Sequence, residues 1–90
     1  MRFAVICQDK PDALPIRMEN RAAHLAYLQS TGVVEMAGPF LDGAGQMCGS
    51  LLILEVASLA AAQDWAADDP YGKAGLFAAV QVIEWKKVIG

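Results

Sequence analysis

The distribution of apolar and polar residues along the chain predicts four strands. Apolar side chains stand at successive positions from Arg2 to Gln8 and from Gly49 to Val56, a pattern typical of strands buried on both faces. Val33 to Ala37 is a shorter apolar run, and apolar and polar residues alternate through much of Phe77 to Val88. Gly38-Pro39-Phe40 is expected to break the second strand ahead of a glycine-containing hairpin-type loop.

A helix is predicted between the first two strands. Asp12 is a candidate N-cap, and Pro15 falls in the first turn, where the missing N–H of proline costs little. We expect the helix to run to Ser30 or Thr31, with Gly32 suited to its C-cap.

A second helix is predicted from Leu59 to Asp68, because Ser58 can cap its first turn and its alanines favour helix. The residue before a proline is disfavoured in the helical conformation. Asp69-Pro70-Tyr71-Gly72 is therefore expected to stop this helix and to hold Asp69 at a sharp corner. Lys73 to Leu76 is expected to be a short turn.

The order β-α-β-β-α-β predicts an α+β fold of the ferredoxin-like type, as one domain over residues 1–90. Right-handed crossovers place both helices on one face of a four-stranded antiparallel sheet, with the first and third strands at its centre. Both central strands carry apolar side chains on both faces, and each Leu, Ile or Val left in water forgoes roughly 1.5–3 kcal/mol. We therefore expect a second copy of the chain to cover the helix-free face in a two-fold homodimer.

Charge and hydropathy argue against nucleic acids and membranes as partners. The formal net charge is −3 and the one basic pair is Lys86-Lys87, which gives little electrostatic support for nucleic-acid binding. No apolar run approaches the length of a membrane span, and the N-terminus has the pattern of a first strand without a signal-peptide cleavage site. The sequence therefore predicts a cytoplasmic protein with no membrane partner.

Two cysteines are too few for a disulfide framework or a zinc site. Cys7 and Cys48 are expected at opposite ends of neighbouring parallel strands, so no disulfide is predicted. No phosphate-binding loop, dinucleotide fingerprint or metal-ligand cluster is present in the sequence, and neither a cofactor nor a metal is expected.

The predicted first helix holds the residues expected to carry chemistry. At 3.6 residues per turn, its apolar stripe comprises Leu14, Met18, Ala22, Leu25 and Leu28. Arg21 falls inside this stripe, and Arg17 and His24 fall along one of its edges. In an ordinary amphipathic helix the charged residues lie on the solvent-exposed face, opposite the apolar stripe. Here they lie in or beside the stripe, which indicates a functional site.

His24, the only histidine, has two interpretations. It can be a helix-edge side chain bonded to a backbone carbonyl, or a general acid or base, because an imidazole changes charge near neutral pH. Asp69 favours the second interpretation. Two helices lying side by side can bring its carboxylate to one ring nitrogen, which leaves the other nitrogen for a small-molecule substrate.

Arg17 and Arg21 are either surface ion pairs, with Glu19 or Asp12 as partner, or a clamp for a carboxylate or phenolate. Asp9 ends the first predicted strand and is either a turn former or the charge that neutralises Arg17.

Six further residues have mainly structural interpretations. Gly49-Ser50 can set a close approach at a strand start, with Ser50 as an occasional hydrogen-bond donor to a ligand. Tyr71 and Trp65 are expected to pack in the interior more than to stack on a substrate. Gly38-Pro39 is expected to serve turn geometry and not to form a ligand loop.

Several segments in order along nearly the whole chain resemble the YciI-like (YCII-domain) family. These segments are Ala-Val-Ile-Cys-Gln-Asp-Lys-Pro at the start, Arg17-x-x-x-Arg21-x-x-His24-Leu25, Ala37-Gly38-Pro39, Gly49-Ser50, Ala66-Ala67-Asp68-Asp69-Pro70-Tyr71 and Lys86-Lys87-Val88. The resemblance implies a dimeric α+β barrel with a histidine/aspartate site between helices and sheet. His24 matches the family histidine, and the aspartate is placed at Asp69, with Asp9 as second choice.

The glycine-rich hairpin after Pro39 is shorter than in the family, which affects the substrate if the hairpin lines the pocket. A dehydrochlorinase acting on a chlorinated hydroxyquinol is the enzymatic theme that the resemblance implies. The first hypothesis is thus a small cofactor-independent lyase or isomerase for a small acid or phenol, in which His24 moves a proton, Asp69 orients it and Arg17 or Arg21 holds the anion. The alternative is a non-catalytic dimeric metabolite-binding or accessory module. A haem- or quinone-handling monooxygenase ranks low, because no second histidine is present.

Overall fold

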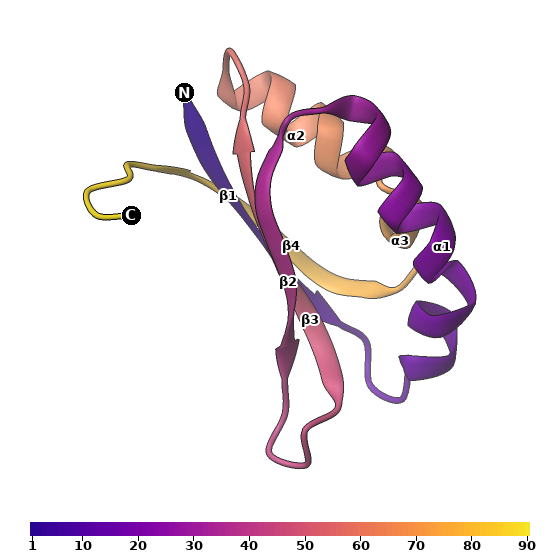
Figure 1. Cartoon of the computed structure of the whole chain (residues 1–90). Helices are drawn as coiled ribbons and strands as arrows, with labels where there is room; N and C mark the ends of the chain where they lie inside the picture. Colours follow the sequence, from indigo (N-terminus) through magenta and orange to yellow (C-terminus); the bar gives the residue numbers. More distant parts are fainter.

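A four-stranded antiparallel sheet carries all helices on one face (Figure 1), and the computed structural model describes the whole of residues 1–90. The elements are β1 (Arg2–Asp9), α1 (Leu14–Thr31), β2 (Val34–Leu41), β3 (Met47–Glu55), α2 (Leu59–Asp68), α3 (Pro70–Lys73) and β4 (Phe77–Trp85). The strand order β2-β3-β1-β4 places β1 and β3 at the centre. The predicted ferredoxin-like architecture is confirmed, with α3 as an additional short helix.

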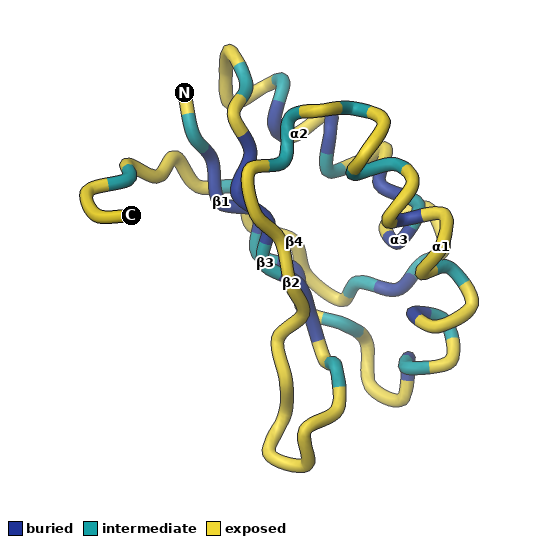
Figure 2. Tube along the Cα trace, viewed as in Figure 1, coloured by how far each residue is buried: buried dark blue, intermediate teal, exposed yellow.

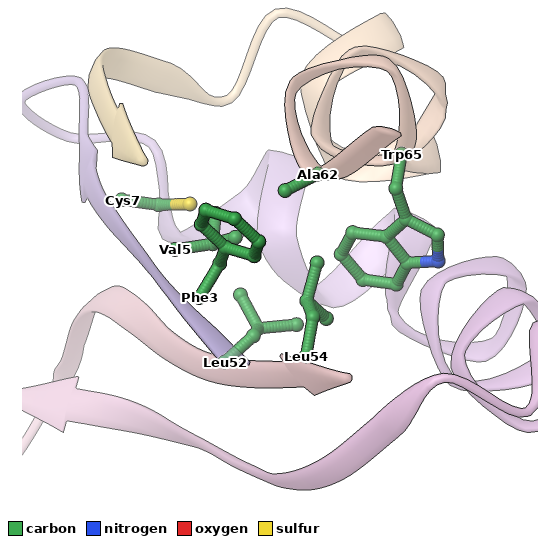
Figure 3. Close-up of a cluster of buried hydrophobic side chains, with 7 residues drawn as sticks. All are labelled: Phe3, Val5, Cys7, Leu52, Leu54, Ala62 and Trp65. Atoms are coloured by element: carbon green, nitrogen blue, oxygen red, sulfur yellow. The ribbon is translucent and has the colours of Figure 1, made fainter. Parts of the chain in front are cut away.

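The core lies between the two central strands and the helices (Figure 3). Phe3 lies opposite Leu54, and Val5 lies opposite Leu52, so these four side chains share one face of the sheet. They pack beneath α2, from which Trp65 reaches down towards Leu54. Burial is concentrated along β1 and β3, whereas β2 is exposed over most of its length (Figure 2).

The ends of α1 are only partly as predicted. Gly32 adopts a left-handed conformation (φ 68°) at the C-cap, which is confirmed. The N-cap is Ala13, without a side-chain hydrogen bond, so the assignment to Asp12 was wrong. Asp12 instead takes a left-handed conformation (φ 57°) in the preceding turn, which its short polar side chain tolerates.

The buried face of α1 also differs from the predicted apolar stripe. Met18, Ala22 and Leu25 are exposed. The buried or half-buried positions of α1 are Leu14, Ile16, Arg17, Asn20, His24, Tyr27, Leu28 and Thr31, of which Leu14 and Leu28 belong to the predicted stripe. Hydrophobicity alone therefore places the stripe only partly correctly, because the paired polar side chains of Arg17 and His24 occupy the centre of the inner face.

β2 does not break at Gly38-Pro39-Phe40 and continues to Leu41, so the predicted break was wrong. Pro39 lies opposite Ser50 of β3. β2 pairs with β3 alone, and an edge strand tolerates a proline because half of its backbone groups need no partner. The chain then turns at Asp42, whose carboxylate accepts hydrogen bonds from the N–H groups of Ala44 and Gln46.

The second half of the chain follows the prediction more closely. α2 spans Leu59–Asp68, and the Ser58 hydroxyl accepts a hydrogen bond from Ala61 N, as predicted for an N-cap. Pro70 does not only end α2, because it also begins the short helix α3. β4 ends at Trp85 and not at Val88; the last five residues leave the sheet.

No helix covers the helix-free face of the sheet, but its central residues Ala4 and Ile53 are buried within the single chain. Its exposed side chains include Met36, Phe40, Ile83 and Trp85, one set from each edge strand. None of the helices is both long enough and apolar enough to span a bilayer.

Candidate functional site

His24 and Asp69 meet between α1 and the corner that joins α2 to α3. His24 Nδ1 lies 2.7 Å from Asp69 Oδ1, and both side chains are buried. Pro70 keeps Asp69 out of the helical conformation (φ −59°, ψ 129°), so the chain turns there. The same Oδ1 atom accepts the N–H of Tyr71 at 3.0 Å, which caps α3 and fixes the carboxylate.

This contact defines the two nitrogens of the imidazole. A carboxylate can only accept a hydrogen bond, so Nδ1 carries a hydrogen, and in the neutral ring the lone pair belongs to Nε2. Nε2 has no hydrogen-bond partner within the chain, and no buried side-chain nitrogen or oxygen lacks one. Nε2 therefore reaches the surface of a cavity that His24 lines.

Arg17, two turns before His24 on α1, is held by two other elements. Its Nε donates to Asp9 Oδ2 at 2.8 Å, and its Nη2 donates to Asp9 Oδ1 at 2.9 Å. Nη2 also donates to Ser50 Oγ at 2.9 Å. Burial opposes the charge, but the hydrogen bonds and the charge of Asp9 raise the pKa of Arg17 above its ordinary value.

These contacts decide between the earlier alternatives for the acidic residues. Asp9 neutralises Arg17 and does not contact His24, so its second-choice assignment as the histidine partner was wrong. Arg17 is buried and pairs with neither Glu19 nor Asp12.

Tyr71 lies against the side chains of both His24 and Arg17. Its ring stacks on the His24 imidazole, with 3.8 Å between centroids and an interplanar angle of 12°. Arg17 Cζ lies over the same ring, 4.8 Å from its centroid. Burial raises the pKa of Tyr71 although the Arg17 charge opposes the shift, so the phenol stays protonated.

A cavity of about 200 Å³ lies between α1 and the β2–β3 hairpin. It is lined by Arg17, Arg21, His24, Leu25, Leu28, Ala37, Gly38, Pro39, Met47, Ser50, Leu52 and Tyr71. One wall is thus polar and comes mainly from α1, and the other is largely apolar.

Arg21 lies at the exposed rim of this cavity and not inside an apolar stripe as predicted. No residue of the chain forms a hydrogen bond or an ion pair with it, in contrast to Arg17. Arg21 is therefore the arginine of this cavity that has no partner within the chain.

The sequence interpretation missed the wall formed by Ala37, Gly38, Pro39 and Met47. The predicted break at Gly38-Pro39 removed these residues from the sheet and so from the site. The strand register could have identified this wall, because a β2 strand that continues past Gly38 places Pro39 opposite Ser50.

Trp65 packs in the core as predicted, and its indole N–H donates to Thr31 Oγ1 at 3.0 Å.

A larger hollow of about 430 Å³ lies between α2, α3 and β4, but no titratable side chain lines it. No group of three or more His, Cys, Asp or Glu side chains is placed to hold a metal ion.

Both cysteines are free thiols. The reason given from the sequence was wrong, because β1 and β3 are antiparallel and Cys7 lies opposite Ser50, near Cys48. Burial, with a smaller contribution from Asp69, raises the pKa of Cys7 to about 12. Cys7 is therefore an inert core residue, whereas Cys48 is exposed.

Comparisons with known proteins agree on one family. The YCII-related domain matches residues 1–86. Protein YciI of Escherichia coli O6:H1 is 43% identical over 97 aligned residues, which cover 98% of this chain and 99% of that protein. An uncharacterized protein of Haemophilus influenzae is 38% identical with the same coverage.

Among solved structures, 5-chloro-2-hydroxyhydroquinone dehydrochlorinase (TftG) from Burkholderia phenoliruptrix AC1100, in complex with 2,5-dihydroxybenzoquinone, superposes with a TM-score of 0.88. It is 41% identical, and the match covers 96% of this chain and 94% of that chain. Family, relatives and fold thus coincide over nearly the full length, and the chain belongs to the YCII-related domain family.

Proposed function

We propose that this protein is a small enzyme that catalyses proton transfer and elimination on a small hydroxylated ring or acid, without a cofactor. One observation carries the proposal: the His24 imidazole is held by Asp69 through Nδ1, while Nε2 is accessible from a cavity. A base in this arrangement has a fixed tautomer, and the imidazolium formed after proton uptake is stabilised by the adjacent carboxylate.

The size of the cavity favours a ligand with one ring. A dry protein cavity of about 150 Å³ can take up a benzene molecule. The cavity beside His24, at about 200 Å³, therefore fits one six-membered ring with a few substituents. Its apolar walls, Leu28, Pro39 and Leu52, suit the faces of such a ring.

The charges favour an anionic or hydroxylated ligand. Arg21 is unpaired at the rim and can hold a phenolate or carboxylate oxygen through its planar donors. In the proposed reaction, His24 Nε2 takes a proton from the substrate, the released electron pair forms a new double bond, and the leaving group departs as an anion with its own bonding pair. The substrate loses the elements of HX without a change in overall oxidation state, and the proton passes from His24 to water.

The structural neighbour supports this class of reaction. TftG is a dehydrochlorinase in complex with 2,5-dihydroxybenzoquinone, and this chain shares its fold at 41% identity. Polyhydroxylated six-membered rings with a leaving group are therefore the first substrates to examine. A non-catalytic module would use the same Arg21 and the same apolar wall, and would bind such a ring without converting it.

The test is chloride release from 5-chloro-2-hydroxyhydroquinone under anaerobic conditions. We expect turnover by the wild type, and a loss of about 10²–10⁴-fold in His24→Gln, because that is the usual contribution of a general base. Asp69→Asn should also lose activity, because the wrong tautomer becomes possible. The exposed Glu19→Gln on the same helix is the matched control and should retain wild-type rates.

Turnover that survives in folded His24→Gln would exclude the imidazole as the base. Binding of 2,5-dihydroxybenzoquinone by the wild type, followed by calorimetry, with no turnover of any halogenated hydroxyquinol would favour the non-catalytic module. Weakened binding in Arg21→Gln would assign the anion contact in either case.

A further inference from the structure

A continuous set of buried contacts connects His24 to a second carboxylate, Asp9, at the far side of the site. The members are Asp69, His24, Tyr71, Arg17, Asp9 and Ser50, and they come from β1, α1, β3 and the α2–α3 corner. We propose that Asp9 and Arg17 are positioning residues that set the orientation of the His24 imidazole through the ring of Tyr71.

The first step is that Arg17 cannot move freely. Two hydrogen bonds to Asp9 and one to Ser50 fix the plane of the guanidinium between the end of β1 and the start of β3. A bidentate pair of this kind specifies orientation as well as distance. The guanidinium is therefore a fixed surface on the inner side of α1.

The second step is that Tyr71 is held between Arg17 and His24. Arg17 and His24 are seven residues apart on α1, which corresponds to about 10.5 Å along the helix axis. The Tyr71 centroid lies 4.8 Å from Arg17 Cζ and 3.8 Å from the imidazole centroid. The Tyr71 ring therefore contacts both side chains, which α1 presents two turns apart.

The third step is that the stack supplies what the hydrogen bond to Asp69 leaves open. That bond fixes the position of Nδ1, but a histidine ring has a broad torsional minimum about its last side-chain bond. Stacking at 12° sets the plane of the ring and so the direction in which Nε2 points. Asp69 also holds Tyr71 itself, because the same Oδ1 accepts the Tyr71 N–H.

Stability alone gives little reason for this arrangement. Removing an arginine and a carboxylate from water costs free energy that their attraction only partly offsets, and an apolar pair of similar volume is often as stable. A pair that orients a reactive ring gives a reason for placing both charges in the interior, since Asp9 and Arg17 are both almost fully buried.

The test uses the fact that His24 is the only histidine, so its ring C–H signals are unique in a proton–carbon NMR spectrum. Stacked on Tyr71, these protons should resonate upfield of their free-peptide positions. In Asp9→Asn and Arg17→Lys we expect them to move downfield, whereas the nitrogen-15 shifts should still report one tautomer, because Asp69 still holds Nδ1. Tyr71→Phe should keep the wild-type shifts, because the ring remains, whereas Tyr71→Leu should lose them.

Glu35→Gln is the matched control, since it breaks the exposed Arg2–Glu35 ion pair and should leave the His24 signals unchanged. Unchanged His24 signals in folded Asp9→Asn or Tyr71→Leu would overturn the proposal. If Asp9→Asn does not fold, Ser50→Ala removes one of the three hydrogen bonds to Arg17 and should give a smaller movement in the same direction.

The consequence for catalysis rests on the proposed function. With 5-chloro-2-hydroxyhydroquinone, Asp9→Asn should lower kcat and change KM little, because Asp9 lies behind Arg17 and only aims the base. The NMR result does not depend on turnover. If the variants shift the His24 signals but the wild type has no activity, only the proposed function is wrong. If the wild type is active but the variants leave the His24 signals unchanged, only the positioning role is wrong.

Discussion

Arg17 and Arg21 stand one helical turn apart, yet their side chains have opposite surroundings. Arg17 is buried and paired with Asp9 and Ser50, whereas Arg21 is exposed and unpaired at the rim of the cavity. At the scale of single residues, the two arginines therefore have different roles: Arg17 stabilises the interior, and Arg21 is available to a ligand.

Arg17→Gln should destabilise the fold far more than Arg21→Gln. The first substitution leaves the Asp9 carboxylate buried without its cation, which costs about 3–5 kcal/mol in comparable buried pairs. The second alters a surface position, where changes stay within about 0.5 kcal/mol. Urea unfolding of both variants measures the difference, and equal losses would contradict the assignment of the two roles.

Cys7 links the stability of the protein to alkaline pH. Its pKa is raised to about 12 in the folded state from 9.0, mainly by burial, so the unfolded chain loses this proton first. The stabilisation is complete below pH 9 and is lost as the pH rises towards 12, at up to about 1.4 kcal/mol per pH unit. Burial raises the pKa values of Tyr27 and Tyr71 as well, which adds to the loss above pH 10.

Denaturant unfolding from pH 8 to pH 11 tests this dependence. The free energy of unfolding should fall more steeply for the wild type than for Cys7→Ala, because alanine has no proton to lose. Parallel slopes for the two proteins would show that the thiol does not contribute.

At the scale of elements, the two central strands approach closely at Gly49. A Cβ atom at this position would collide with the carbonyl oxygen of Cys7 on β1, so β3 requires glycine there. Gly49→Ala should cost about 1–3 kcal/mol through displacement of the strand, as in overpacked cores. Gly43→Ala is the control, because open space surrounds that position in the β2–β3 turn. Equal thermal unfolding midpoints for the two variants would contradict this account.

The order and type of the elements could be predicted from apolar patterns, and so could Gly32 and Ser58 as helix caps. The inner face of α1 could not, because the side chains that pack there include Arg17 and His24. Their burial depends on Asp9 and Asp69, which are distant in sequence, and no local pattern carries that information. The pairing of His24 with Asp69 was within reach only because the topology places α1 and α2 side by side.

At the scale of the whole molecule, no helix covers the helix-free face, and its edge strands expose apolar side chains. Exposed apolar side chains on β2 and β4 lie over it beside the central strands, among them Phe40, Ile83 and Trp85. Contiguous apolar surface of this kind marks an interaction site. We propose that a second copy of the chain covers it in a two-fold homodimer, as the sequence also suggested.

The dimer should have twice the 9.6 kDa mass of one chain in sedimentation equilibrium. Ile83→Glu should shift the mass to that of a monomer, because a carboxylate would be buried at the contact. Leu59→Glu, at an equally exposed apolar position on α2, should not. A wild type that stays at 9.6 kDa at high concentration would rule out this assembly.

The pairing of His24 with Asp69 across 45 positions also has a consequence for synthesis on the ribosome. An unfinished chain that has not yet reached the Asp69-Pro70-Tyr71 corner carries the imidazole but nothing to aim it, and the last strand must follow before the sheet closes. Under the proposed function, fragments that end before Asp69 should be inactive, and the site can form only after Asp69 and β4 have been synthesised.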